Sequence, residues 1–184
     1  MKELSDKDII EYLYNCYAKV DGLWFVKTEE EHGFDKALAL DAEVWKVMPK
    51  IQARFLKEKF LEKNAETPAE KHKKAHEKST EDPVELFIKA IKIKMALDRF
   101  KFKILKKPGI INVEITECPW HNILIKSGRE SLSGRIGSVI CTTEYPAFAG
   151  EFIPGVVLEL DSRICNKDKN CIFNFEIKTG SYEK

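Results

Sequence analysis

Four of the five cysteines lie in the second half of the chain, at positions 118, 141, 165 and 171. The first of them opens the segment Cys118-Pro119-Trp120-His121, which holds a thiol and an imidazole three residues apart. Such groups bind soft metals, act as nucleophiles or fill a core, depending on their burial and neighbours. The candidate catalytic pair is Cys118 and His121, and the candidate metal ligands are Cys118, His121, Cys141, Cys165 and Cys171.

Cys118 is expected at a junction between a strand and a helix, with Pro119 as the first helical residue. The unpaired amides at a helix start lower the pKa of a nearby thiol, so the position favours a thiolate at Cys118. His121 falls on the same helical face and could supply a proton or a second ligand. The alternative is a half-buried thiol beside a histidine that bonds to backbone.

Cys165 and Cys171 flank a polar loop at residues 166–170. If strands pair across this loop, the two cysteines face each other with β-carbons about 4.5–5.5 Å apart, which suits a shared metal or a disulfide. Both could equally pack at strand ends, and a lone cysteine such as Cys141 is more often a core residue. The cofactors considered are zinc and an iron-sulfur centre, but the lack of a Cys-x-x-Cys pair disfavours a standard zinc ribbon or ferredoxin-type cluster.

Three further residues could border a bound small molecule. Trp120 could form the wall of a pocket beside Cys118, and Arg129 and Arg135 could hold a carboxylate. Surface ion pairs are the alternative for the two arginines, and core positions are the alternative for Trp120 and are expected for Trp24 and Trp45. The chain has no Gly-rich phosphate loop, Gly-x-Ser-x-Gly elbow or His-Glu-x-x-His helix.

The charge balance argues against nucleic acid and membranes as partners. The sequence has 31 Lys and Arg against 30 Asp and Glu, for a net charge of +1, so no overall field attracts polyanions. No apolar run approaches the roughly 18 residues of a membrane span, and the charged N-terminus is unlike a secretory signal. We therefore expect a cytoplasmic protein, where thiols stay reduced and five cysteines indicate core, metal or catalytic roles before disulfides.

Apolar residues at three- and four-residue steps predict helices in the first half. The first begins at Ser5 or Asp6 and ends at Gly33, and the second begins near Asp35 and is broken or kinked at Pro49. The segment 82–85, Asp-Pro-Val-Glu, predicts a third helix start in which the glutamate bonds back to the cap.

Beyond Arg99 the apolar period becomes two and predicts strands that start near residues 100, 111, 156 and 171. Helices should lie between the two hairpins, with a separate short turn of helix after Pro146. The expected fold is α+β, with N-terminal helices packed on a four-stranded, mainly antiparallel twisted sheet made of two hairpins. The expected parts are a helical segment 1–62, a charged linker or solvated helix 63–82, and an α+β domain 83–184, together forming one compact unit.

Several short phrases of the chain resemble known families. They are Val20-Asp21-Gly22-Leu23-Trp24-Phe25, Phe34-Asp35-Lys36-Ala37-Leu38, Glu117-Cys118-Pro119-Trp120 and the terminal Cys165-x5-Cys171-Ile172-Phe173. These resemble uncharacterised archaeal and bacterial cytosolic proteins related to the L-2-amino-thiazoline-4-carboxylic acid hydrolase-like family. The closing strand pair also resembles the end of the 4-vinyl reductase domain. That resemblance implies the ligand-binding fold of nitric-oxide sensing and Golgi transport proteins, with Cys118, Cys165 and Cys171 at the family's cysteine positions.

Three functions follow from these observations. The favoured one is a cytosolic protein that binds a metal or a small molecule in a pocket lined by cysteine and histidine. The second is a cysteine-dependent hydrolase, in which Cys118 attacks a sulfur-containing ring or amide and His121 moves the proton. The third is a non-catalytic, partner-binding subunit that uses its N-terminal helices, and a homodimer is one form of it.

Overall fold

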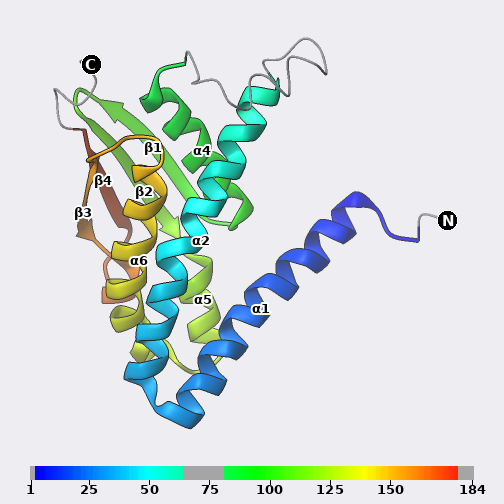
Figure 1. Ribbon diagram of the computed structural model, residues 1–184. Helices are drawn as coiled ribbons and strands as arrows, with labels where there is room; N and C mark the ends of the chain where they lie inside the picture. Colours follow the sequence, from blue (N-terminus) through cyan, green and yellow to red (C-terminus); the bar gives the residue numbers. More distant parts are fainter. Residues whose placement is uncertain (1–2, 64–80, 178–184) are drawn as a thin grey trace. The chain divides into compact units, whose positions relative to one another are not determined.

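The computed structural model describes residues 3–63 and 81–177 (Figure 1). The chain consists of two compact units, Met1–Val44 and Trp45–Lys184. Helices and one antiparallel sheet confirm the expected α+β class. The expected division at residues 62 and 82 stays a prediction, and most of its charged middle segment lies outside the described residues. The α-helices among the described residues are α1 (Asp6–His32), α2 (Phe34–Lys63), α4 (Pro83–Leu97), α5 (Pro119–Lys126) and α6 (Ser133–Gly150).

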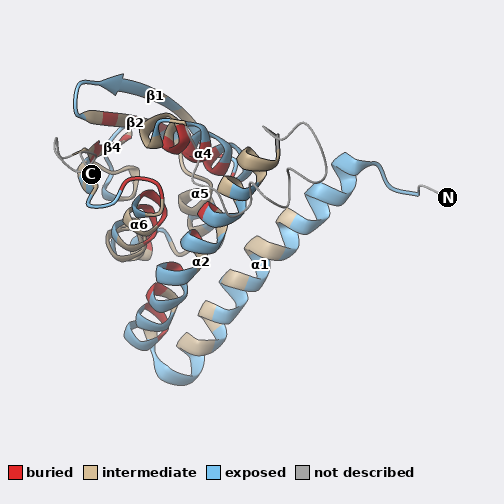
Figure 2. Cartoon of the chain, turned by 45° about the horizontal axis from the view of Figure 1, so that its top comes forward, coloured by how far each residue is buried: buried red, intermediate tan, exposed pale blue. Residues whose placement is uncertain are grey.

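The first unit contains α1 and the beginning of α2. Ser5 caps α1 as expected: its Oγ accepts from the amide of Asp8 at 3.2 Å, and its own amide donates to the Asp8 carboxylate at 2.9 Å. Helix α1 has no buried residue (Figure 2). Trp24 is 72% exposed, so the core position expected for it is wrong. The described part of this unit offers only one neighbouring helix, and a single neighbour covers a narrow side of α1.

Three local expectations about the helices differ from the structure, at least in part. α2 continues through Pro49, so a break there is wrong, while a kink stays a prediction. α6 continues through Pro146, where a separate turn was expected. Pro49 is fully buried, so packing offsets the lost backbone hydrogen bond. Asp82 does cap α4, accepting from the amide of Val84 at 3.0 Å, but Glu85 binds Lys106 at 2.5 Å instead of bonding back to the cap.

The second unit contains the sheet, with strand order β1-β2-β4-β3 and antiparallel neighbours throughout. The strands are β1 (Lys101–Lys107), β2 (Ile110–Glu117), β3 (Val157–Ser162) and β4 (Cys171–Glu176). The two hairpins therefore form as expected, and they join through β2 and β4. In that central pair Val113 lies opposite Phe173, and Ile115 lies opposite Cys171.

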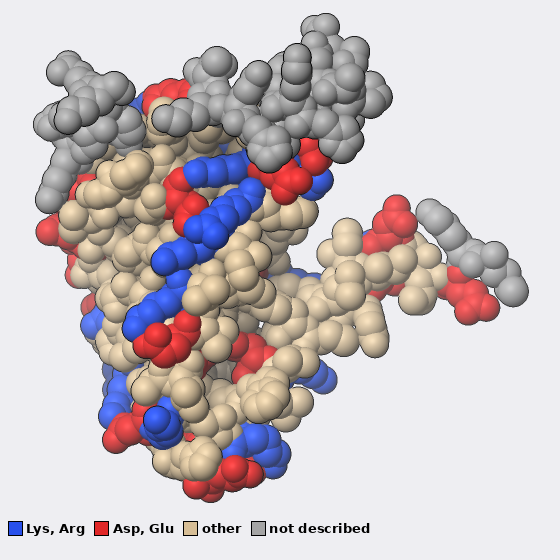
Figure 3. Space-filling model, in the orientation of Figure 1, with Lys and Arg blue, Asp and Glu red and all other residues tan. Residues whose placement is uncertain are grey.

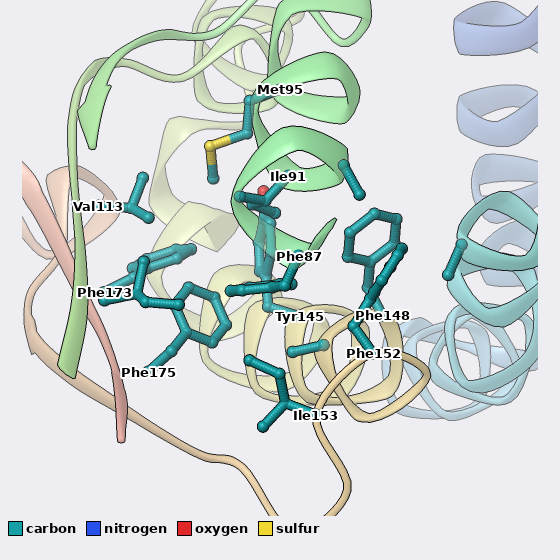
Figure 4. Close-up of a cluster of buried hydrophobic side chains, with 14 of the residues drawn as sticks. Phe87, Ile91, Met95, Val113, Tyr145, Phe148, Phe152, Ile153, Phe173 and Phe175 are labelled. Atoms are coloured by element: carbon teal, nitrogen blue, oxygen red, sulfur yellow. The ribbon is translucent and has the colours of Figure 1, made fainter. Parts of the chain in front are cut away.

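Alternate residues of β2 and β4 face the helices and form the core. Phe87 of α4 packs against Phe175 of β4 with ring centroids 5.0 Å apart, and Tyr145 of α6 packs against Phe173 at 4.8 Å (Figure 4). The same cluster includes Ala53 of α2. The apolar sides of the strands and of the helices thus meet on one face of the sheet. None of the described helices combines the length and apolar character that a bilayer span requires.

Candidate functional site

The sheet register brings Cys171 and Cys118 to the same end of the central strand pair. Cys171 is the first residue of β4 and lies opposite Ile115 of β2. Two residues after Ile115, β2 ends at Glu117, and Cys118 then occupies the N-cap position of α5 with Pro119 as the first helical residue. The strand-to-helix junction expected at Cys118 is therefore confirmed. Neighbouring ends of two paired strands supply two of the four thiols.

Cys165 lies in a short 3-10 helix, η2 (Ile164–Asn166), between β3 and β4. Strand β3 ends at Ser162, so Cys165 is not the cross-strand partner of Cys171, and the facing pair expected from the sequence is wrong. The turn departs from a simple hairpin because the amide of Ile164 donates to the Cys171 sulfur at 3.2 Å. This bond ties the turn to the start of β4.

Two glycines of α6 allow the Cys165 turn to approach that helix. A β-carbon at Gly137 would lie 2.8 Å from the Cys165 sulfur, and one at Gly134 would lie 3.1 Å from the Cys165 carbonyl oxygen. Cys141 follows Gly137 by one helical turn, so it lies on the same side of α6. The third and fourth thiols are thus brought together by close packing of η2 on α6.

The pKa values of the four thiols are raised, chiefly by burial. Burial raises the pKa of Cys118 to about 12, and the charges of Cys171 and Cys165 add to this rise. Burial also raises the pKa of Cys141 well above its usual range, with further contributions from Glu144 and the other three thiols. The pKa values of Cys165 and Cys171 are raised as well, chiefly by burial. At neutral pH all four groups are thiols.

The thiolate expected at Cys118 is therefore a wrong prediction. The backbone amides of His121 and Trp120 do lie close enough to lower the pKa of Cys118, as the helix start suggested. Loss of solvation is the larger effect, because a charged sulfur in an apolar surrounding has no water to stabilise it.

His121 is held by a serine rather than by Cys118. Its Nδ1 lies 2.6 Å from Oγ of Ser133, the first residue of α6, and Ser133 is almost completely buried. This hydrogen bond links α5 to α6 beside the cysteines. It leaves His121 as a neighbour of the cluster with one ring nitrogen already engaged.

The residues proposed to border a small molecule lie at different degrees of burial. Trp120 packs edge-to-face against Trp45 with ring centroids 6.1 Å apart, which places it at the edge of the core. Arg129 is half-buried immediately before a 3-10 helix, η1 (Glu130–Leu132), and Arg135 is exposed on α6. Their role in holding a carboxylate stays a prediction.

Sequence reasoning missed a buried ionic cluster next to the thiols. The Lys94 ammonium lies 2.7 Å from carboxylate oxygens of both Asp98 and Glu144, and all three side chains are largely buried. Burial alone would lower the pKa of Lys94, but the two carboxylates raise it above its usual value. Glu144 follows Cys141 by three residues on α6. The available signals were the i,i+4 spacing of Lys94 and Asp98 and a lysine on the apolar side of α4.

Among residues 3–63 and 81–177, no three or more His, Cys, Asp or Glu side chains are arranged as they stand to hold a metal ion. All five cysteines are free thiols. The cluster of Cys118, Cys141, Cys165 and Cys171, called the thiol cluster below, is therefore a set of close, protonated sulfurs rather than a closed coordination site.

Residues 2–81 match a family of unknown function, DUF6125. This segment contains α1 and α2 and ends before α4, so it contains none of the thiol cluster. Searches of curated proteins and of solved structures found no match to the chain.

Proposed function

We propose that the protein binds a soft metal ion through the thiol cluster, with zinc as the first ion to test. The observation that carries the proposal is the convergence of four thiols from four separate elements: the N-cap of α5, α6, η2 and the start of β4. Thiolates select zinc and other soft metals over magnesium and calcium. The four thiols come from positions up to 53 residues apart in the sequence.

The electrostatics of the cluster support a cation as the occupant. Negative charge on Cys165 and Cys171 would raise the pKa of Cys118, and negative charge on Cys118, Cys165 and Cys171 would raise that of Cys141. A divalent cation reverses this repulsion and drives deprotonation, so binding would release protons. The charged neighbour Glu144, already paired with Lys94, keeps further negative charge near Cys141.

Metal binding requires the sulfurs to move closer together. Zinc–sulfur bonds near 2.3 Å place ligands within about 4 Å of each other. We expect the movement at the Cys165 side chain, because Cys165 is only partly buried, whereas Cys171 is buried at the start of β4. The proposal therefore includes a shift of the Cys165 turn on binding.

The proposal also includes a reducing, cytoplasmic location and the relationship to the thiazoline hydrolase-like and 4-vinyl reductase families. The five free cysteines are compatible with a reducing compartment. The family relationship is supported by the motif residues around Cys118 and Cys171.

The hydrolase alternative is less supported, because a nucleophilic cysteine needs a lowered pKa and that of Cys118 is raised to about 12.

The test is metal binding by the reduced, full-length chain under anaerobic conditions. Zinc is titrated in competition with a chromophoric chelator, and cobalt is substituted to detect thiolate-to-metal charge transfer. We expect about one ion per chain, release of protons, and a loss of affinity on the order of 100-fold in Cys171→Ser. Cys16→Ser is the matched control, because Cys16 is an exposed thiol on α1 in the first unit.

Two outcomes would overturn the proposal. One is the absence of sulfur-to-cobalt charge transfer in a correctly folded wild-type protein. The other is an equal loss of affinity in Cys16→Ser and Cys171→Ser, which would place the metal elsewhere.

A further inference from the structure

Ser133 is a buried serine whose hydroxyl does not cap a helix. It is the first residue of α6, and a serine near a helix start usually accepts from a backbone amide. Here Leu132 occupies the N-cap position and no side chain caps the helix. The Ser133 Oγ lies instead 2.6 Å from Nδ1 of His121, and Ser133 is only 2% exposed. The hydroxyl therefore holds the imidazole ring rather than the helix start.

The bond to Ser133 determines which nitrogen of His121 can bind a ligand. A neutral imidazole has one N–H group and one nitrogen with a free lone pair. When Nδ1–H donates to the serine oxygen, the lone pair is at Nε2, as in histidines that bind metal ions through Nε2. Within the described residues the bond to Ser133 is the only hydrogen bond of the imidazole, so Nε2 is available.

His121 is tied to the segments that carry two of the thiols. Its backbone amide donates to the Cys118 sulfur, so that sulfur lies at the start of α5 beside His121. Its partner Ser133 precedes Gly134, where a β-carbon would lie 3.1 Å from the Cys165 carbonyl oxygen. Through Ser133 the imidazole is therefore also tied to the part of α6 on which the Cys165 turn packs.

Buried charge beside the thiol cluster favours a neutral fourth ligand. On the face that Figure 3 shows, acidic and basic side chains lie at the surface. Lys94, Asp98 and Glu144 are largely buried instead, and their two carboxylates and one ammonium leave one negative charge. A zinc ion with four thiolates would add two more negative charges in this low-dielectric surrounding, whereas three thiolates and one imidazole add only one.

Cys141 is the thiol that this buried charge disfavours as a ligand. It precedes Glu144 by three residues on α6, so the two side chains lie on the same side of the helix. Burial raises the pKa of Cys141, and the negative charge of Glu144 raises it further. The same repulsion would act on a thiolate at Cys141 that binds a metal ion, which makes His121 the better fourth ligand.

We propose that His121, oriented by Ser133, supplies the fourth ligand of the metal site through Nε2. The three thiolates are then Cys118, Cys165 and Cys171, and the remaining member of the thiol cluster stays a neutral thiol. This assignment rests on the proposed binding of metal by the thiol cluster. Three cysteines and one histidine form one of the tetrahedral combinations that hold structural zinc. Ser133 is a positioning residue, which fixes the ring and its tautomer.

X-ray absorption of the zinc-loaded, reduced, full-length protein tests the ligand set without any substitution. We expect three sulfur neighbours at about 2.3 Å and one nitrogen neighbour at about 2.0 Å from the zinc ion. Four sulfur neighbours and no nitrogen would overturn the assignment of His121 and leave metal binding by the thiol cluster intact. A chain that binds no zinc would overturn both proposals.

The zinc affinity of single variants separates the histidine ligand from the spare thiol. In competition with a chromophoric chelator, His121→Gln should weaken zinc binding on the order of 100-fold, whereas Cys141→Ser should bind like the wild type. His32→Gln is the matched control, because His32 is an exposed histidine on α1. If His121→Gln binds zinc as tightly as His32→Gln does, the imidazole is not a ligand.

Ser133→Ala tests the positioning role. Loss of the outer partner of a metal-binding histidine typically weakens affinity about 10–100-fold, and we expect a loss of this size. The ligand-field bands of the cobalt-loaded protein should shift in Ser133→Ala and return in Ser133→Thr, which keeps the hydroxyl. A bond that only links α5 to α6 would lower the urea midpoint of Ser133→Ala but change neither the affinity nor the cobalt spectrum. That result would overturn the role of Ser133.

Discussion

Gly137→Ala tests directly whether the Cys165 turn packs on α6. The added β-carbon would lie 2.8 Å from the Cys165 sulfur, well inside the 3.4–4 Å of ordinary contact. Overpacking of this size costs about 1–3 kcal/mol. Alanine in a helix interior is favoured over glycine by about 1 kcal/mol, which offsets part of that cost. The net expectation for the wild-type background is therefore a loss of up to about 2 kcal/mol in unfolding free energy.

In a Cys165→Ala background the sulfur is absent, and the nearest remaining atom of the side chain is the β-carbon at 3.7 Å. Gly137→Ala should then stabilise the protein by about 1 kcal/mol through helix propensity alone. The coupling free energy between positions 137 and 165 is the difference between the effects of Gly137→Ala in the two backgrounds, about 1–3 kcal/mol. Urea unfolding under reducing conditions measures all four members of this cycle.

Gly150→Ala is the control on the same helix, because a β-carbon there meets no atom within 4 Å. Its effect should be the same in both backgrounds. If Gly137→Ala changes stability equally with and without the Cys165 sulfur, within about 0.3 kcal/mol, the placement of Cys165 on α6 is refuted, and the thiol cluster with it.

Three further predictions concern buried charge and buried thiols. Lys94→Met should lower the free energy of unfolding, measured with urea, by about 3–5 kcal/mol, because it leaves two buried carboxylates without their cation. Lys89→Met, at an exposed ion pair, should change that free energy by less than about 0.5 kcal/mol. The free energy of unfolding should fall as pH rises above 9, because the pKa of the Cys118 thiol is 9.0 in the unfolded chain and about 12 in the folded protein. Urea midpoints measured at pH 7, 9 and 10.5 should therefore fall less with pH in Cys118→Ala than in the wild type. Iodoacetamide at neutral pH should label the exposed Cys16 and leave Cys118 unmodified in peptide mass spectra, and equal labelling would contradict its burial.

The sequence alone predicted the elements and the fold class. The change of apolar period near Arg99 separated helices from strands, and the turn at 107–109 gave the β1–β2 hairpin. Cap residues Ser5 and Asp82 marked two helix starts. These features are local, since periodicity and capping depend on residues within one or two turns of each other.

Local rules failed where packing competes with them. Pro146 lies inside α6, and Glu85 binds Lys106 on β1 instead of the cap. At Cys118 the backbone amides at the helix start lower the pKa, as local reasoning expects. Burial under neighbouring elements raises the pKa by more than these amides lower it. Burial depends on the whole fold, so no local pattern could give its sign.

The sequence predicted part of the candidate site, and tertiary packing decided the rest. Its thiol residues were identified from their types and positions, and the sequence also predicted the junction that presents Cys118. Their convergence depends on the pairing of Ile115 with Cys171 and on Gly137, whose missing side chain admits the Cys165 turn. The burial of Lys94 with Glu144 also depends on contact between segments that are distant in the sequence. Sequence sets which groups exist and which local elements carry them, whereas contacts between distant segments arise only when sheet register and helix packing bring those segments together.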